Sequence, residues 1–472
     1  MKTWGARLAA QPDALALAFG QSLDVDVELA VDDVTGSIAY ARALGEAGIL
    51  SAEEVDLVVS GLASIRADVE RGAIEWDPAL EDVHMNVEVE LGRRIGPVAR
   101  KLHAGRSRND QVSTDLRLWL RRSTDELDAA LVALERELVV LARRHPAAVM
   151  PAHTHTQPAQ PVLFAHHLLA YVEMLERDRG RLADARRRAN VSPLGAGAIA
   201  GSGVALDRER LAAELGFEGL TRNSIDASGD RDFVVEALAA VALAMVHLSR
   251  FAEELVWWSG PGFGFVRLAD PFVTGSSMLP NKRNPDPAEL VRGRTARVIG
   301  HLTGALALLK GLPLGYQRDL QEDKAPLFEG VRTLRASLAI LARVVATLEV
   351  DEARMAAAIG NGALTAVAAA DALSAFGVAF RDAHQVVGGL VRAAEERGVA
   401  LASLDDAAIA QALAESGDPV AHQLAGRTDI GAIVRGALEI DGAIARCDVI
   451  GGTAPRRVAL ELEGAAARLG VD

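Results

Sequence analysis

The most constraining feature of this chain is a series of long, uninterrupted helical patterns in its middle. Between residues 113 and 145 leucines recur at alternating spacings of four and three, at Leu127, Leu131, Leu134, Leu138 and Leu141. That spacing is typical of a coiled-coil seam. Further long helical patterns cover about 158–188, 230–259, 285–311 and 323–348. Helices of this length would be ~40–50 Å long, and their apolar faces need partners, which favours a bundle shared between subunits.

The composition fits a fold of helices packed on helices. Half of the 472 residues are apolar, only 4% are aromatic, and Ala and Leu are abundant. The formal net charge of −14 argues against nucleic acid as a partner. The single cysteine, Cys447, excludes a disulfide framework and fits the cytoplasm. We predict an all-α protein with an N-terminal helical domain, a central bundle domain and a small C-terminal helical domain, over 1–105, 106–354 and 355–472.

No membrane segment is predicted. The N-terminus lacks the continuous apolar run of a signal peptide. The most apolar long stretch, about 233–258, carries charged and titratable residues that a membrane-spanning helix would not tolerate: Glu236, His247, Arg250, Glu253 and Glu254. We therefore expect a buried core helix there.

Lysine is rare in this chain. Only five of the 50 basic residues are Lys, and Lys282 and Lys324 are two of them. A chain that prefers Arg so strongly would use it wherever either cation serves. Lys282 and Lys324 are therefore candidates for positions that need a compact ammonium group, although chance placement is the alternative for each.

Residues 275–290, GSSMLPNKRNPDPAEL, combine two serines, a lysine and several Gly and Pro residues on a loop that leads into a helix. Ser276 or Ser277 is a candidate base for abstracting a carbon-bound proton, and Lys282 a candidate stabiliser of the charge that results. Asn284 is a candidate polar ligand. The N–H groups at the start of the helix at 285 are candidate donors to a serine alkoxide. A Gly-Ser-Ser turn alone would be an ordinary solvated turn, but the complete run is more specific.

A second segment, His-Thr-His-Thr-Gln at 153–157, precedes a helix that we predict from about residue 158, with Pro158 and Pro161 in its first turns. Histidine suits protonation of a leaving nitrogen near neutral pH. Glu289 is a candidate for orienting one of these histidines. The segment has no HExxH pattern and no cysteine partner, so no metal site is predicted.

Two further segments are candidate ligand-binding regions. GRSRNDQ at 105–111 places guanidinium, hydroxyl and amide groups at a helix start, which suits a ligand with several carboxylates. GYQRDLQEDK at 315–324 offers Tyr316, Gln321 and Lys324 to an amino-acid-like substrate. Each is also compatible with an ordinary capped helix start.

Together these segments resemble the aspartase/fumarase superfamily and, within it, the argininosuccinate lyase family. GSSMLPNKRNPD resembles the superfamily signature, and GRSRNDQ, HTHTQPAQPVLFAHHLLAY, DRDFVVE and YQRDLQEDK resemble the argininosuccinate lyase versions of the other segments. The resemblance extends from WGARL at 4–8 to FRDAHQVVG at 380–388.

The resemblance implies reversible anti-elimination of argininosuccinate to fumarate and arginine, without a cofactor, by a homotetramer whose active sites each draw on three subunits. It implies that Ser276 is the base and that His155 is the acid or its relay, with Lys282 and Asn284 on the succinyl carboxylates. It implies further substrate contacts from residues around these groups: Ser22, Asp26, Asp82, Ser107, Arg108, Asn109, Thr154, Gln157, Arg231, Ser277, Tyr316, Gln321 and Lys324.

The chain also departs from the family pattern at several positions: WGARL, Gly20, Tyr40, Thr156, Leu279, Asn281 and the pair Gln317–Arg318. None of these removes a predicted catalytic group. They leave open a sibling lyase that releases fumarate from another N-substituted aspartate. A non-catalytic structural homologue, like the lens crystallins of this family, is the other alternative.

Overall fold

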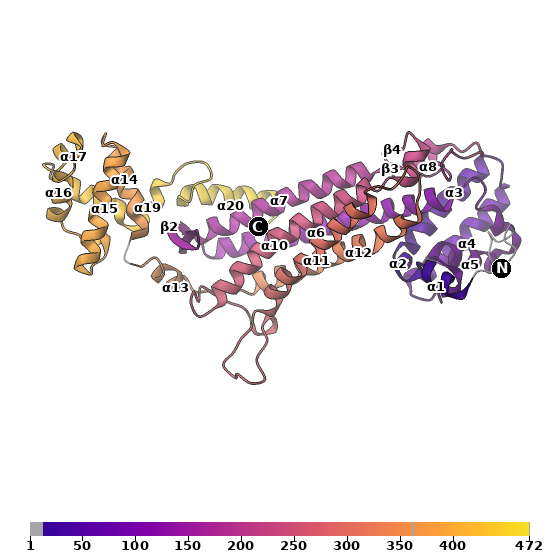
Figure 1. Cartoon of the computed structure of the whole chain (residues 1–472), viewed down its shortest axis with the longest axis horizontal. Helices are drawn as coiled ribbons and strands as arrows, with labels where there is room; N and C mark the ends of the chain where they lie inside the picture. Colours follow the sequence, from indigo (N-terminus) through magenta and orange to yellow (C-terminus); the bar gives the residue numbers. More distant parts are fainter. Residues whose placement is uncertain (1–12, 361–362, 472) are drawn as a thin grey trace. The chain divides into compact units, whose positions relative to one another are not determined.

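The computed structural model describes residues 13–360 and 363–471, and most of these residues are helical (Figure 1). The segment WGARL at 4–8 lies outside the described residues. Within the described part of the chain, the five longest helices are α6 Arg108–Arg144, α7 Phe164–Ala189, α10 Asp232–Ser259, α11 Asp286–Leu309 and α12 Lys324–Ala346. These are the five long helices that the sequence predicts, with most ends displaced by a few residues.

The leucine seam of α6 is buried along its whole length. Leu127, Leu131, Leu134, Leu138 and Leu141 are each 0% exposed. Since a buried leucine contributes roughly 1.5–3 kcal/mol of transfer free energy, this seam is a major source of the stability of α6.

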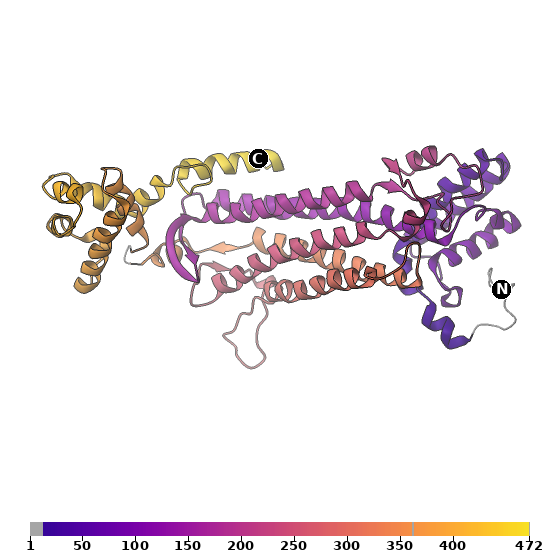
Figure 2. The same ribbon diagram turned by 45° about the horizontal axis from the view of Figure 1, so that its top comes forward.

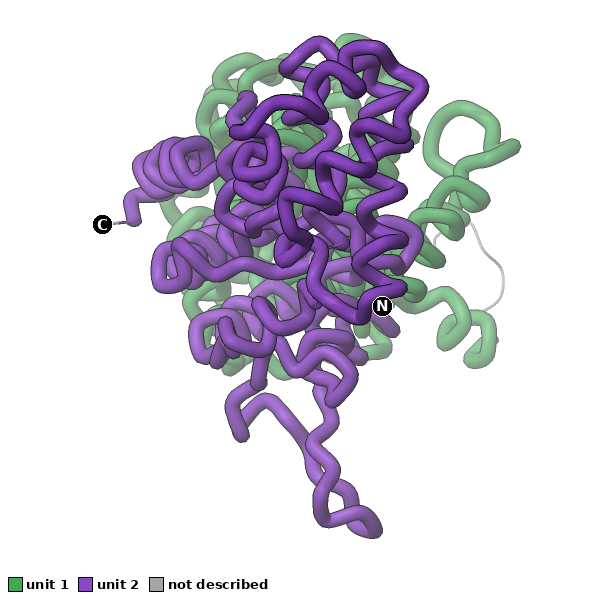
Figure 3. Tube along the Cα trace, turned by 90° about the vertical axis from the view of Figure 1, so that its left-hand side faces the viewer, with its two compact units in different colours: residues 1–129, 178–245, 294–335 green, residues 130–177, 246–293, 336–472 purple. Residues whose placement is uncertain are grey.

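The chain divides into two compact units, and each is assembled from separate stretches of sequence (Figure 3). Unit 1 comprises residues 1–129, 178–245 and 294–335, and unit 2 comprises residues 130–177, 246–293 and 336–472. Each long helix contributes its two ends to different units.

In unit 1 the long helices pack through large side chains. The rings of Trp119 on α6 and Phe328 on α12 have centroids 4.4 Å apart, and the Arg117 guanidinium lies 4.1 Å from the Phe233 ring. The unit also holds shorter helices and two small strands: α1 Ala14–Gly20, α2 Leu23–Asp26, α3 Ala30–Glu46, α4 Ala52–Glu70, α5 Val83–Ile95, β3 Val191–Ser192, α8 Arg208–Glu214, β4 Gly219–Leu220 and α9 Ser224–Gly229.

The shorter helices of unit 1 have their own apolar core, which includes the fully buried Tyr40, Leu44 and Leu62. A capping box starts α4, because the Ser51 side chain accepts from the Glu54 N–H while the Glu54 carboxylate accepts from the Ser51 N–H. The sequence predicted this motif, which fixes where α4 begins.

In unit 2 the segment after α6 is a β-hairpin, formed by β1 Val149–Thr154 and β2 Gln157–Leu163, and α7 begins only at Phe164. The prediction of a helix from residue 158 was therefore wrong by six residues. Pro158 and Pro161 lie in β2, where a two-stranded sheet leaves backbone edges that need no N–H donor.

The remaining elements of unit 2 flank a long loop and form a small helical region. The loop, residues 273–284, is called the signature loop below and projects beyond the helices of its unit (Figure 2). The other elements are β5 Val266–Arg267, β6 Glu349–Val350, α13 Glu352–Ala357, α14 Ala366–Ser374, α15 Phe380–Arg397, α16 Asp406–Ala414, α17 Pro419–Leu424, α18 Ile430–Leu438, α19 Ile440–Arg446 and α20 Pro455–Leu469.

Among the described residues, α10 is the one helix long and apolar enough to cross a membrane, with a mean hydropathy of 1.7 in its most apolar window. More than half of that window is buried inside the protein. Within unit 2, Glu254 accepts hydrogen bonds from the Tyr171 hydroxyl and pairs with His167, each at 2.7 Å. The helix therefore has the contacts of a core helix, as the sequence indicated.

Candidate active site

The signature loop is fixed at its base and exposed at its tip. Thr274 and Asn284 exchange backbone hydrogen bonds of 3.0 and 2.8 Å across the base, and the Thr274 hydroxyl donates to Asp286 at 2.5 Å. Arg283 adds an ion pair of 2.6 Å to Asp270. Between these contacts the loop is largely exposed, with Met278 at 86%. Because only its base is fixed, the loop can move without disturbing the helices.

Ser276 lies at the start of the exposed tip. Its hydroxyl oxygen accepts hydrogen bonds from the backbone N–H groups of Met278 and Leu279, at 3.2 and 3.0 Å. Two N–H donors on one oxygen also favour its alkoxide form. In this structure the loop's own backbone supplies these donors, and donors from the start of the following helix stay a prediction. The side chain of Lys282 is exposed.

His155 occupies the tip of the β1–β2 hairpin. Thr154 and Gln157 face each other across a two-residue turn formed by His155 and Thr156, both of which have positive φ angles, 54° and 60°. Non-glycine residues in this conformation cost roughly 1–3 kcal/mol each, and such strain is concentrated at functional sites. The turn presents Thr154, His155 and Gln157 on an exposed edge of unit 2.

Glu289 does not orient a histidine in this structure. Its carboxylate lies 3.9 Å from the Arg292 guanidinium one helical turn along α11, and the side chain is 46% exposed. Over the described ranges no hydrogen bond or ion pair joins Glu289 to a histidine. The pairing of Glu289 with a histidine is thus not made within the described part of this single chain and stays a prediction.

In unit 1 a buried ionic network surrounds Lys324. Its ammonium lies 3.7 Å from Asp26 and 3.4 Å from Asp323, and it donates to the backbone oxygen of Gln321 at 3.2 Å. Asp323 also pairs with Arg231, and the Ser22 hydroxyl donates to Asp26. All four charged groups are less than 5% exposed. Four residues predicted to bind substrate (Ser22, Asp26, Arg231 and Lys324) thus belong to one network.

The electrostatics of this network keep its lysine charged. Burial would lower the pKa of Lys324, but the attraction of Asp323 and Asp26 outweighs it and raises the pKa above the ordinary value. Two buried atoms of the network, Asp26 Oδ1 and Arg231 Nη2, have no hydrogen-bond partner in the structure. A polar ligand would form the hydrogen bonds that these two buried atoms lack. Nearby Tyr316 is partly buried, and that burial raises the pKa of its hydroxyl.

The GRSRNDQ segment leads into the first turn of α6, which begins at Arg108. The Asn109 N–H donates to the Ser107 hydroxyl at 3.2 Å, and the Ser107 N–H donates to Asp110 at 3.0 Å. The second oxygen of Asp110 accepts from the N–H groups of Gly195 and Gly197, at 3.0 and 2.8 Å. These bonds fix the start of α6 against the Gly-rich segment 192–203.

Arg108 and Asp82 form an ion pair of 3.1 Å. Asp82 is also the N-cap of α5, accepting from the Met85 N–H at 2.7 Å. Both residues line a cavity of about 1030 Å³ in unit 1, together with Gly20 and Arg318. The cavity walls carry both signs of charge, which suits a ligand that does the same.

Two of the departures from the family pattern meet at this cavity. Arg318 donates to the backbone oxygen of Gly20 and pairs with Glu81 at 3.1 Å. Glu81 has a positive φ of 64° and directly precedes Asp82. The contact between Arg318 and Gly20 therefore lies in the same part of the cavity wall as Asp82.

The eighteen predicted site residues divide between the two units. Unit 2 carries the residues with a predicted chemical role and their neighbours, which are Thr154, His155, Gln157, Ser276, Ser277, Lys282, Asn284 and Glu289. Unit 1 carries Ser22, Asp26, Asp82, Ser107, Arg108, Asn109, Arg231, Tyr316, Gln321 and Lys324.

Two residues of unit 1 were missed from the sequence. Asp323 joins Lys324 to Arg231, and Arg318 joins Gly20 to Glu81. The position of Asp323 beside one of the rare lysines was an available signal. The contact between Arg318 and Gly20 spans almost three hundred residues and left no local pattern.

Comparison with known proteins shows the class of protein to which the chain belongs. Residues 6–300 match the family model described as "Lyase", and residues 363–445 match "Argininosuccinate lyase C-terminal". Among solved structures, EDDS lyase in complex with formate aligns with a TM-score of 0.82 at 30% identity, covering 98% of this chain and 93% of that one. The fold is thus that of an all-α lyase.

Two relatives that match almost the whole chain identify the family within this class of lyases. An argininosuccinate lyase of Halorhodospira halophila is 48% identical over 466 residues, covering 99% of this chain and 97% of the relative. An argininosuccinate lyase of Nitrosococcus oceani is 48% identical over 457 residues, covering 97% and 95%. The chain belongs to the argininosuccinate lyase family.

Proposed function

We propose that the protein catalyses the reversible anti-elimination of L-argininosuccinate to fumarate and L-arginine, a step of arginine biosynthesis. The observation that carries the proposal is the 48% identity to argininosuccinate lyases over nearly the whole chain, together with the matching C-terminal region. Ser276, His155 and Lys282 are all present, and fold alone would not require them.

In the proposed mechanism, the Ser276 oxygen takes the proton from the carbon beside a succinyl carboxylate. The electron pair of that C–H bond moves into the carboxylate and forms an aci-carboxylate, whose extra charge Lys282 and Asn284 stabilise. The pair then returns to form the C=C bond of fumarate while the C–N bond breaks. The leaving guanidino nitrogen takes its electron pair and a proton supplied by His155, directly or through water.

The two groups of residues have different roles in this mechanism. The N–H groups of Met278 and Leu279 assist the Ser276 alkoxide, and movement of the signature loop brings it to the substrate. The charged groups of unit 1, including the buried Arg231 and Lys324 and the partly exposed Arg108, hold the polar ends of the substrate. We propose that this division is completed in a cytoplasmic homotetramer, whose sites combine residues of several subunits, and that no cofactor takes part.

Incubation with argininosuccinate while fumarate is followed by its ultraviolet absorbance tests the proposal. Release of fumarate is expected. A sibling lyase remains the alternative because EDDS lyase shares the fold at 30% identity, against 48% for the argininosuccinate lyases. Turnover of aspartate or adenylosuccinate but not of argininosuccinate would favour the sibling, and no turnover of any aspartyl adduct would favour a structural role.

A further inference from the structure

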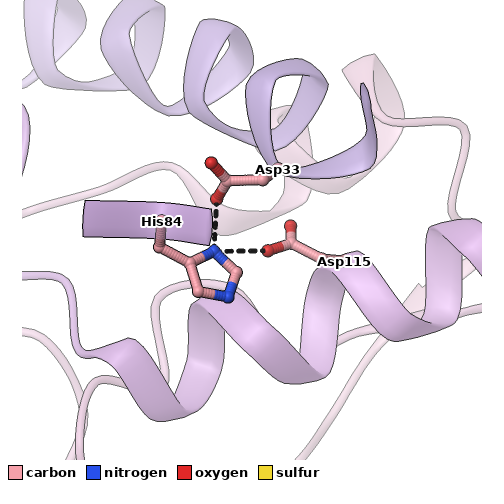
Figure 4. Close-up of side chains that lie close together, drawn as sticks. All are labelled: Asp33, His84 and Asp115. Carbon is pink, nitrogen blue, oxygen red and sulfur yellow. Dashed lines mark hydrogen bonds and ion pairs between the residues drawn. The ribbon is translucent and has the colours of Figure 1, made fainter. Parts of the chain in front are cut away.

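A second group of titratable side chains lies in unit 1, outside the network around Lys324. Asp33 of α3, His84 of α5 and Asp115 of α6 meet with both carboxyl groups directed at the same imidazole nitrogen, Nδ1 (Figure 4). His84 Nδ1 lies 2.9 Å from Asp33 Oδ1 and 3.6 Å from Asp115 Oδ2, and the three side chains are each about 1% exposed. None of them has a role in the mechanism proposed above.

Gln111 connects this Asp33–His84–Asp115 cluster to the substrate-binding segment. Its side-chain N–H donates to Asp33 Oδ1, and its side-chain oxygen accepts from Arg108 at 2.8 Å. A guanidinium offers only donors, so the amide must present oxygen to Arg108 and N–H to Asp33. Arg108 in turn pairs with Asp82, the cap of the helix that carries His84. The contacts therefore run from Asp33 through Gln111 and Arg108 to Asp82, which caps the helix that carries His84.

These contacts give the carboxyl groups of Asp33 and Asp115 different hydrogen-bonding environments. Asp33 Oδ1 receives hydrogen bonds from both His84 and Gln111, which is the environment of an ionised acceptor. Asp33 Oδ2 and Asp115 Oδ2 are both buried without a hydrogen-bond partner, so the two carboxyl groups differ in the two hydrogen bonds to Asp33 Oδ1. Gly36 leaves room for the Asp115 carboxyl, since a Cβ there would lie 3.3 Å from Asp115 Oδ1.

We propose that Asp115 is a neutral carboxylic acid beside an ionised Asp33, and that this asymmetric pair positions Arg108 for substrate through Gln111. The residues of the Asp33–His84–Asp115 cluster are therefore positioning residues. An ionised Asp33 orients the Gln111 amide, the amide oxygen orients Arg108, and the proton on Asp115 removes repulsion between two buried carboxylates.

The electrostatic surroundings agree with this assignment. Burial first, and then the charge of Asp33, raise the pKa of Asp115 well above its ordinary value. Burial also raises the pKa of Asp33, but the interactions with His84, Arg106 and Arg108 outweigh it and lower the pKa. The charged and titratable groups that face the pair are Asp32 from α3, His84 from α5, Arg106 from the segment before α6 and Arg108 from α6.

A metal ion is the competing interpretation, because the three ligand atoms lie within 4.8 Å of one another. The Gln111 N–H already occupies Asp33 Oδ1, and Arg106, which donates to Ser37 at 3.0 Å, supplies positive charge. Both features leave less reason for a further cation.

Matched isosteric variants test the proposal. Asp115→Asn keeps a neutral donor in place of the acid and should change KM for argininosuccinate by less than about threefold. Asp33→Asn replaces the ionised acceptor that orients Gln111 with a neutral amide, which weakens this hydrogen bond, and should raise KM about 10- to 100-fold, with a smaller effect on kcat. Gln111→Glu, which loses the N–H but keeps the oxygen toward Arg108, should resemble Asp33→Asn. Equal losses in Asp115→Asn and Asp33→Asn would overturn the assignment.

Two measurements do not depend on turnover and so separate this inference from the proposed function, on which the KM readout rests. Infrared spectra at neutral pH should contain a protonated carboxylic acid band in the wild-type protein that is missing in Asp115→Asn, and the lack of such a band in the wild type would contradict the proposal. Titration with Zn²⁺ or Co²⁺ should give no tight site that depends on Asp33 and Asp115. Finding one would replace the proposal with a metal site.

Discussion

The signature loop and the network around Lys324 show two opposite ways of placing functional groups. Ser276 and Lys282 lie on a loop that is fixed only at its base, whereas Lys324, Asp26, Asp323 and Arg231 are almost completely buried and paired. In the proposed mechanism, the group that must move to the substrate is therefore on the loop, while the groups that recognise charge are preorganised. Substitutions in the loop should therefore affect turnover alone, and substitutions in the network should affect both binding and stability.

The largest effect is expected for Ser276→Ala. Without the hydroxyl no base removes the carbon-bound proton, so kcat should fall by about 100- to 10,000-fold. Substrate binding, followed by calorimetry, should persist, and the melting temperature should be unchanged. Ser277→Ala is the matched control and should retain far more activity. A Ser276→Ala enzyme with full turnover would refute the assignment of the base.

Lys282→Met should reduce kcat by about 100- to 1,000-fold, because it removes the cation that stabilises the aci-carboxylate. Lys282→Arg tests whether a compact ammonium is needed, and it should recover only part of the rate because its planar fork distributes charge differently. Steady-state kinetics on both variants measure this. If Arg restored wild-type kcat, the argument from the scarcity of lysine would fail.

Lys324→Met should instead lower the free energy of unfolding by about 3–5 kcal/mol, because Asp26 would be left as a buried charge without a cation and Asp323 would keep only Arg231. Urea denaturation measures the change. Lys282→Met, the equivalent substitution on the exposed loop, is the control and should shift stability by less than about 0.5 kcal/mol. Equal stability of the two variants would remove the contrast between loop and network.

Sequence reasoning identified the five long helices, because helical periodicity is a local signal, whereas the site residues that it named from dense motifs stay a prediction. It missed the β-hairpin around His155, since prolines at 158 and 161 resemble helix starts as much as edge-strand residues. It also missed the partners of individual groups. Lys324 meets Asp26 from almost three hundred residues away, and Ser276 takes its donors from its own loop. Such contacts depend on the tertiary structure and cannot be predicted from the spacing of residues along the sequence.

A pH experiment extends the contrast to Asp32, a buried carboxyl of α3. Burial, opposed by Arg122, raises the pKa of Asp32 from 3.8 to about 6. Because the folded-state pKa is raised, Asp32 contributes stability below pH 3.8 that is lost as the pH rises through about 6. That contribution should amount to at most about 3 kcal/mol.

The measurement compares wild-type protein and Asp32→Asn in urea at about pH 4 and about pH 7.5. The variant does not ionise at this position, so its unfolding free energy should gain on that of the wild type as the pH rises. A difference that stays constant with pH would show that Asp32 titrates normally. Ser276→Ala serves as the loop control, and its difference from the wild type should not change with pH.

The smallest effect is expected where the chain departs from its family, at Arg318. Its side chain is 57% exposed and reaches Glu81 and the Gly20 backbone. An exposed contact of this kind contributes less than about 1 kcal/mol, so Arg318→Ala should leave the melting temperature almost unchanged and raise KM by only a few fold. The reason for any rise is the link through Glu81 to Asp82 in the cavity wall. Arg318→Lys and Gly20→Asn should be better tolerated together than the sum of their separate effects on KM predicts, because the two positions are in contact. Strictly additive effects on KM would show that the two positions are not coupled and that neither affects the cavity wall through the other.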